Sequence, residues 1–185
     1  MLLKFFKLVI ILLIYQSPLY SKNKTLNDFN SHHLSNYFSG IIAYENNDNS
    51  EALKFFKLSK FLINNHDSYF KRYVYTLVIE GKVQYATNEI RQNLNKGNSN
   101  YFEAYLILAL DSLKKKDYTK SKDYLKKSYE FINNDKIALL LAEALKQYLY
   151  VFENNKNVTI KQNFGNFSLV NEAFQKCYLG DKSTS

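Results

Sequence analysis

The chain has few of the residues that interrupt or cross-link a fold. Its 185 residues include no tryptophan, one proline, five glycines and one cysteine. Proline and glycine disfavour helix interiors, so their scarcity is typical of a mostly helical chain. The single cysteine, Cys177, excludes an intrachain disulfide and leaves either a free thiol or a link between chains. Stability must therefore come from packing, and the neighbours Ala173 and Phe174 predict that the thiol is buried.

Sequence motifs for enzymatic chemistry are also missing. The chain contains neither the glycine-lysine phosphate loop nor the glycine fingerprint of dinucleotide-binding folds. The adjacent His32 and His33 point to different faces of a helix and make a poor metal site, and His66, in a polar break, is expected to be a solvated loop residue. We therefore predict a non-enzymatic protein with no catalytic residue, no cofactor and no metal site.

Positive charge is abundant, but nearly all of it is lysine. Lysine and arginine total 25 against 17 acidic residues, and only Arg72 and Arg91 are arginine. Arginine is the residue favoured for bidentate phosphate recognition. Abundant Lys, Asn, Tyr, Phe and Ile without Trp is the composition expected from AT-rich codons. This composition disfavours nucleic acid as a partner. The alternative function is that of a helical protein that binds a membrane surface or nucleic acid through the basic face Lys114–Lys127.

The first residues indicate a targeting segment. Lys4 and Lys7 precede an apolar run from Leu8 to Tyr15, and the small residue Ser21 follows. A helix of that run spans about 12 Å at ~1.5 Å per residue, whereas the hydrocarbon core of a bilayer is about 30 Å thick. We therefore predict a signal peptide over residues 1–21, cleaved to give a periplasmic or secreted protein. An uncleaved signal that anchors the chain in the inner membrane is the alternative.

Three small residues recur at a nearly constant spacing. Ala52, Ala86 and Ser121 are 34 and 35 residues apart. A large apolar residue follows each by four positions, a smaller residue precedes each by twelve, and a turn-forming pair begins five positions before each. The large apolar residues are Phe56, Ile90 and Leu125, and the smaller residues are Gly40, Val74 and Ala109. The turn-forming pairs are Asn47-Asp48, Gly81-Lys82 and Lys116-Asp117. A fixed period in this range indicates one helix-turn-helix unit copied in tandem.

This pattern resembles the tetratricopeptide repeat (TPR), a helical hairpin of about 34 residues. The third unit is the closest match, from Lys116-Asp117-Tyr118 to Asn133-Asn134-Asp135. The family's early tryptophan is absent, and Asn64 and Asn133 replace its closing proline. The resemblance implies an all-α fold in which antiparallel helical hairpins stack as a right-handed α-solenoid. An ordinary helical bundle with coincidental spacing is the other interpretation.

The expected organisation follows from the repeat. A flexible polar lead (22–32) precedes a repeat region (33–153) made of units 33–66, 67–100 and 101–135 and a long helix 136–153. A polar connection from 154 leads to a last helix over 168–179, capped by Ser168, and a tail ending at 185. Because the last helix keeps an apolar face, either it packs entirely on the preceding helix or the chain is the first part of a longer repeat protein.

The resemblance also implies where a partner binds. In the family, the first helices of successive units line a concave groove that holds an extended peptide. The corresponding positions here are Tyr37, Ile41 and Tyr44, then Lys71, Tyr75 and Val78, then Leu106, Leu110 and Leu113. The predicted partner is therefore another protein or an extended peptide, and a homo-oligomer stays open. A shift of one position would instead turn these residues toward neighbouring helices.

Overall fold

The protein is helical throughout the part of the chain that the structure describes. The computed structural model describes residues 31–64, 66–94, 96, 99–158 and 164–180, so the predicted signal peptide, most of the polar lead and the C-terminal tail lie outside the described residues. The helices are α2 (Ser31–Glu45), α3 (Asn49–Leu58), the 3-10 helix η2 (Lys60–Asn64), α4 (Asp67–Ile79), α5 (Val83–Asn93), α6 (Phe102–Lys114), α7 (Tyr118–Tyr129), α8 (Lys136–Asn154) and α9 (Asn166–Tyr178). No strand occurs among these residues, which confirms the all-α prediction.

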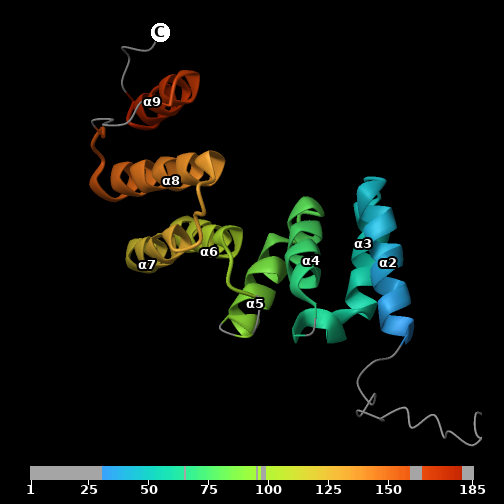
Figure 1. Cartoon of the computed structure of the whole chain (residues 1–185). Helices are drawn as coiled ribbons and strands as arrows, with labels where there is room; N and C mark the ends of the chain where they lie inside the picture. The colour runs from blue at the N-terminus through green and yellow to red at the C-terminus, as the bar shows by residue number, and fades with distance from the viewer. Residues whose placement is uncertain (1–30, 65, 95, 97–98, 159–163, 181–185) are drawn as a thin grey trace, which may run out of the picture.

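Each helix packs mainly on its neighbours in the sequence. Helices α2 and α3 form one pair, α4 and α5 a second, and α6 and α7 a third, and α8 packs on α7 and α6. Figure 1 shows that the helices form an open, bent row from α2 at one end to α9 at the other. Such a row leaves both end helices with one neighbour fewer than the helices between them.

The turns inside the three pairs share one geometry. Asn47, Gly81 and Lys116 adopt left-handed backbone angles with φ of 62°, 71° and 59°. The next residue donates its N–H to a carbonyl five residues earlier, over 2.9, 2.8 and 2.9 Å, as in a Schellman motif. Asp48 and Asp117 then cap the second helix, because each carboxylate accepts a hydrogen bond from the N–H three residues later.

The recurring small residues lie where the two helices of a pair meet. Ala52, Ala86 and Ser121 are fully buried. In the third pair the Ser121 hydroxyl donates to the Ala109 carbonyl over 2.7 Å. In the first pair Gly40 lies so close to Phe56 that a Cβ atom there would come within 2.7 Å of the ring. The period of the sequence therefore marks a buried small residue in each pair and a close contact between helices in the first and third pairs.

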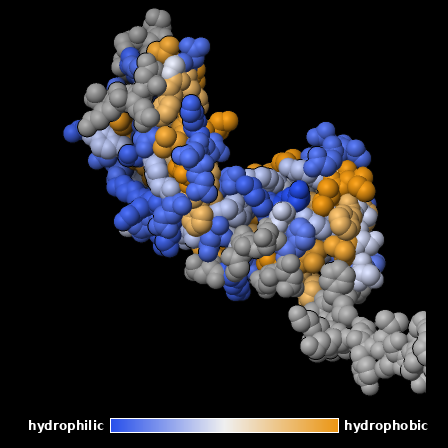
Figure 2. Space-filling view, in the orientation of Figure 1, coloured by the Kyte–Doolittle hydropathy of each residue, from blue (hydrophilic) through white to orange (hydrophobic). Residues whose placement is uncertain are grey.

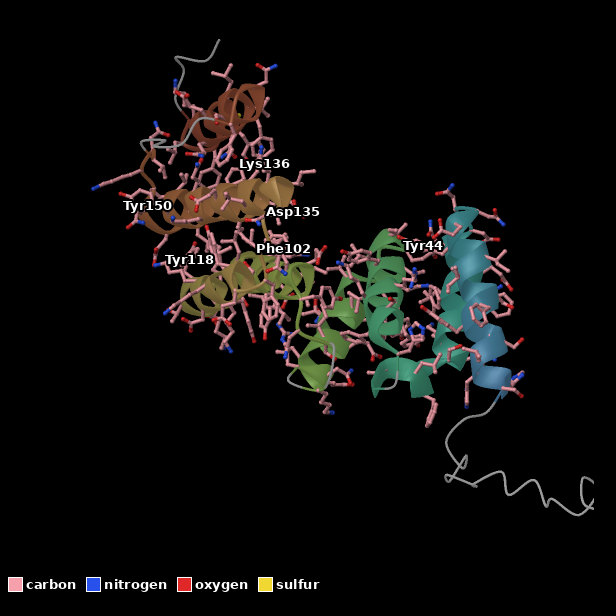
Figure 3. All side chains as sticks on the ribbon, viewed as in Figure 1. Tyr44, Phe102, Tyr118, Asp135, Lys136 and Tyr150 are labelled. Carbon is pink, nitrogen blue, oxygen red and sulfur yellow. The ribbon has the colours of Figure 1, made fainter. Side chains whose placement is uncertain are left out.

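Two clusters of apolar side chains make up the core, and α6 contributes to both. Ala104, Tyr105 and Leu108 pack into the cluster built by α2 to α5. Phe102 and Ala109 pack into the second cluster, with Leu125 of α7 and four residues of α8. Figure 3 shows Phe102 beside the start of α8. Helix α6 is therefore the element that joins the two halves of the row.

The last two helices begin close to the expected positions. Asp135 caps α8 by accepting hydrogen bonds from the N–H groups of Ile137 and Ala138. The last helix starts at Asn166, two residues before the predicted start, because Gly165 (φ 64°) turns the chain and serves as the N-cap. Ser168, the predicted cap, lies inside the first turn, and its hydroxyl accepts a hydrogen bond from the N–H of Phe164.

Replacing Gly40 with alanine tests the close contact in the first pair. The Cβ of Gly40→Ala would overlap the Phe56 ring, which is fully buried. Overpacking costs ~1–3 kcal/mol, against a gain of up to ~1 kcal/mol from removing a helical glycine. We expect a net fall in the free energy of unfolding of about 1 kcal/mol, measured by urea denaturation.

The matched control is Ser35→Ala, at an exposed position of the same helix. It should leave stability unchanged or raise it by a few tenths of a kcal/mol (~0.5 at most). Equal stabilisation by both substitutions would contradict the contact.

Candidate functional site

The candidate site is the side of α2, α4 and α6 that carries the nine predicted positions, called here the first-helix face. Its members differ widely in exposure. Tyr37 is 1% exposed and Leu110 is 48% exposed. The other seven are half-buried: Ile41, Tyr44, Lys71, Tyr75, Val78, Leu106 and Leu113. The face is therefore accessible in part, and its residues also pack on the core.

Tyr37 does not lie on the surface, contrary to its predicted place in a groove. Its ring packs against His66 at 4.6 Å and Tyr69 at 5.8 Å between ring centres. Its hydroxyl accepts a hydrogen bond from Nη1 of Arg72 over 2.9 Å. Tyr37 therefore holds α2 against α4, which is the role that the alternative interpretation of these positions expected.

His66 also differs from the sequence-based expectation. It was expected to be a solvated loop residue, but its side chain is half-buried against Tyr37 and its Nδ1 atom is buried. Its backbone caps the start of α4. Within the described residues, no group of three or more His, Cys, Asp or Glu side chains is placed to hold a metal ion.

Lys71 lies at the centre of a polar and aromatic cluster between α4 and α6. Its Nζ atom lies 3.0 Å from Oε1 of Glu103. The same ammonium group sits over the rings of Tyr75 and Tyr101, at 5.5 and 5.4 Å from their centres. An ammonium group over aromatic faces is attracted to their electron density, typically by about 0.5–2 kcal/mol. The cluster thus fixes the side of α4 against the first turn of α6.

The protonation states in this cluster favour one fixed arrangement. Burial, together with the hydrogen bond to the Glu103 carboxylate, raises the pKa of the Tyr75 hydroxyl well above its ordinary value. Burial works to raise the pKa of Glu103, but hydrogen bonds from Tyr75 and Lys71 outweigh it and lower that pKa. At neutral pH the cluster therefore holds a neutral Tyr75 and an ionised Glu103.

Lys71 is consequently already paired with an acid of its own chain. The sequence had singled it out as the one basic residue able to hold a peptide carboxylate on this face. Glu103 and Tyr101 were not among the predicted site residues. The sequence signal that could have found Glu103 is its spacing, because it lies 32 residues after Lys71, close to one repeat.

The basic face Lys114–Lys127 is partly neutralised. Lys115 pairs with Asp111 at 2.7 Å, Lys120 with Asp117 at 2.9 Å and Lys122 with Glu153 at 2.6 Å. The four lysines of this face that make no ion pair with a described residue are Lys114, Lys116, Lys126 and Lys127. Its positive potential is therefore smaller than the run of lysines indicates.

Helix α9 exposes apolar side chains and buries polar ones. Asn171 and Gln175 are the buried residues, and both donate hydrogen bonds to the side-chain oxygen of Gln147 on α8, over 2.6 and 3.1 Å. Leu169 and Val170 are 65% and 67% exposed. Cys177 is exposed on this helix, so the prediction of a buried thiol was wrong. The hydrogen bonds to Gln147 orient α9 so that Cys177 is exposed, while the rings of Phe174 and Tyr178 contact Tyr148 and Phe152 of α8.

Apolar surface gathers at both ends of the row. Figure 2 shows it over α2 at one end and along α8 and α9 at the other. On α2 the exposed residues are Phe38 (53%) and Ile42 (63%). None of the helices in the described part of the chain combines the length and apolar character that crossing a bilayer requires.

Comparisons with known proteins do not assign this chain to a family. A scan against models of protein families gives no match, and searches of curated proteins and of solved structures give no significant match either. The resemblance to the TPR family therefore stays a prediction from the sequence.

Removing the Tyr75 hydroxyl tests the polar cluster. Tyr75→Phe deletes a hydrogen-bond donor to Glu103, so the pKa of Glu103 should rise toward its ordinary value, measured by carbon NMR of the carboxyl group. A lowered pKa means that the ionised Glu103 stabilises the fold at neutral pH and that this contribution is lost as pH falls through the lowered pKa. The variant should therefore unfold at a higher pH on acid titration.

Tyr85→Phe is the control, because Tyr85 is 68% exposed on α5. It should leave both the pKa of Glu103 and the acid transition unchanged. An unchanged pKa in Tyr75→Phe would show that Tyr75 does not hold the carboxylate.

Proposed function

We propose that the chain is an exported, non-enzymatic scaffold of the TPR type that binds another protein or an extended peptide through the first-helix face. In this proposal the helix pairs stack as a right-handed α-solenoid. The observation that carries the proposal is the repetition of one turn geometry and one buried small residue at Asn47/Ala52, Gly81/Ala86 and Lys116/Ser121. A tandem array of such helix pairs is the arrangement that solenoid proteins use to bind a partner along one side.

The accessible part of this face has the chemistry of a protein-binding surface. Leu106, Leu110 and Leu113 follow one another at helical spacing on α6, with Leu110 the most exposed. Half-buried aromatic residues continue the face, Tyr44 on α2 and Tyr75 on α4. Tyrosine is enriched among the residues that contribute most to binding energy at protein interfaces, and exposed apolar patches mark protein-binding sites. Since Lys71 is paired with Glu103, the expected partner contributes apolar side chains rather than a terminal carboxylate.

A second candidate function uses the basic face Lys114–Lys127 to bind a membrane surface or nucleic acid. The four lysines of this face without an ion pair to a described residue favour it. The three ion pairs with Asp111, Asp117 and Glu153 lower the positive charge of this face, because each cancels one lysine charge. We rank this function second for that reason.

Peptide selection with the purified mature protein tests the first-helix face. Sequences enriched from a random peptide library should share apolar side chains, and Leu110→Asp should weaken their binding by about tenfold or more, since it places a charge in an apolar contact. Calorimetry measures the affinity. The matched control Tyr85→Asp, on exposed α5, should bind as the wild type does. Equal weakening by both variants, or no enriched peptide, would remove this face as the binding site.

Export is proposed from the N-terminal segment and has its own test. The full-length chain, expressed in a bacterium, should be recovered from the periplasm with an intact mass that lacks residues 1–21, cut after Ser21. Replacing two leucines of the apolar run with arginine should keep the chain in the cytoplasm at full length. Recovery of uncleaved protein from the membrane fraction would instead support the signal anchor.

A further inference from the structure

A hollow between α7 and α8 forms a second site that is separate from the first-helix face. Its volume is about 380 Å³, which lies in the usual range of small-molecule sites (roughly 300–1,000 Å³). Four residues of each helix line it, and on both helices they follow the spacing i, i+3, i+4, i+7. They are Lys122, Leu125, Lys126 and Tyr129 on α7, and Lys146, Leu149, Tyr150 and Glu153 on α8. Figure 3 shows Tyr150 at the edge of the row where α7 and α8 face each other.

The floor of the hollow is apolar. Leu125 and Leu149 are 4% and 2% exposed, and they belong to the same core cluster. The Tyr150 ring on the rim is 46% exposed, so part of this apolar wall faces solvent in the free protein. A ligand that fills the hollow would therefore remove apolar surface of both itself and the protein from water.

Ion pairs close the two ends of the hollow. At one end Lys122 pairs with Glu153 over 2.6 Å. At the other end Tyr129 donates a hydrogen bond to Glu143 over 2.6 Å, and Lys146 lies 3.4 Å from the same carboxylate. These contacts show that α7 and α8 run antiparallel along the hollow. Each end is thereby neutral.

Lys126 is the third lysine that lines the hollow, besides Lys122 and Lys146. It lies between the two closed ends and makes no ion pair with a described residue. A compact ammonium group attracts one anionic group as a point charge, in contrast to the bidentate fork of arginine. The hollow therefore combines an apolar floor, two neutral ends and one uncompensated positive charge on its rim.

We propose that this hollow binds a single-chain monoanionic amphiphile, namely an aliphatic monocarboxylate of medium chain length. The hydrocarbon chain lies over Leu125 and Leu149 between α7 and α8, and the carboxylate pairs with Lys126. A polyanion does not suit the site, because the other two lysines already have acidic partners. A cationic amphiphile would meet Lys126 with a like charge.

Calorimetric titration of the mature protein with decanoate, below its micelle-forming concentration, tests this proposal. We expect one site per chain, and Lys126→Gln should weaken binding about fivefold, the effect of one solvent-exposed ion pair. The control Lys127→Gln removes a neighbouring exposed lysine that does not line the hollow, and it should leave binding unchanged. Tyr150→Ala should also weaken binding, because it removes an apolar wall whose loss an exposed position tolerates. Amide NMR shifts caused by decanoate should map to α7 and α8.

Four results would overturn the proposal. The first would be that decanoate does not bind. The second would be that Lys126→Gln binds decanoate as tightly as the wild type does. Decyltrimethylammonium binds as tightly as decanoate, which would show unspecific attachment to apolar surface. Anionic phospholipid vesicles bind while monomeric decanoate does not, which would favour the membrane-surface function of the basic face. All four results are independent of the peptide selection, since Leu110 does not line the hollow.

Discussion

The row of helices depends on close contact between two helices at positions where one side chain is small. In the first pair this contact is Gly40 against Phe56, and in the third the Ser121 hydroxyl bonds the Ala109 carbonyl directly. The distance between two packed helices depends on the side chains at their contact. The left-handed residue of each turn makes the reversal of the chain between the two helices possible. In the first and third pairs, the close contact and the turn occur together at the same spacing.

Charged groups then link one pair to the next. The carboxylate of Asp111 on α6, 8% exposed, is held by Arg91 of α5 at 2.5 Å and by Lys115 at 2.7 Å. Burial opposes its ionisation, but these two cations outweigh that effect and lower its pKa. Lys71 and Glu103 make a similar link from α4 to α6. Half-buried ion pairs of this kind orient neighbouring pairs without closing the row into a bundle.

The candidate sites follow from this open arrangement. A row in which each helix meets mainly its sequence neighbours leaves part of the first helices uncovered and leaves gaps between successive pairs. The first-helix face lies on the first helices, and the hollow between α7 and α8 is one of the gaps between successive pairs. The same arrangement leaves Phe38 and Ile42 at one end and Leu169 and Val170 at the other uncovered by any described helix.

The sequence by itself determined the helical character, the positions of the turns and the buried small residues, because glycine, asparagine and aspartate at turns and the spacing of apolar residues are local properties. Only the tertiary structure decided which side of each helix is covered. Tyr37 and Leu110 were predicted for the same face, yet one is buried and the other is half exposed. Cys177 was predicted buried but is exposed, because Asn171 and Gln175 of α9 bond Gln147. The orientation of a helix depends on partners distant in the sequence, and a rotation of one residue about its axis (~100°) exchanges a buried side chain for an exposed one.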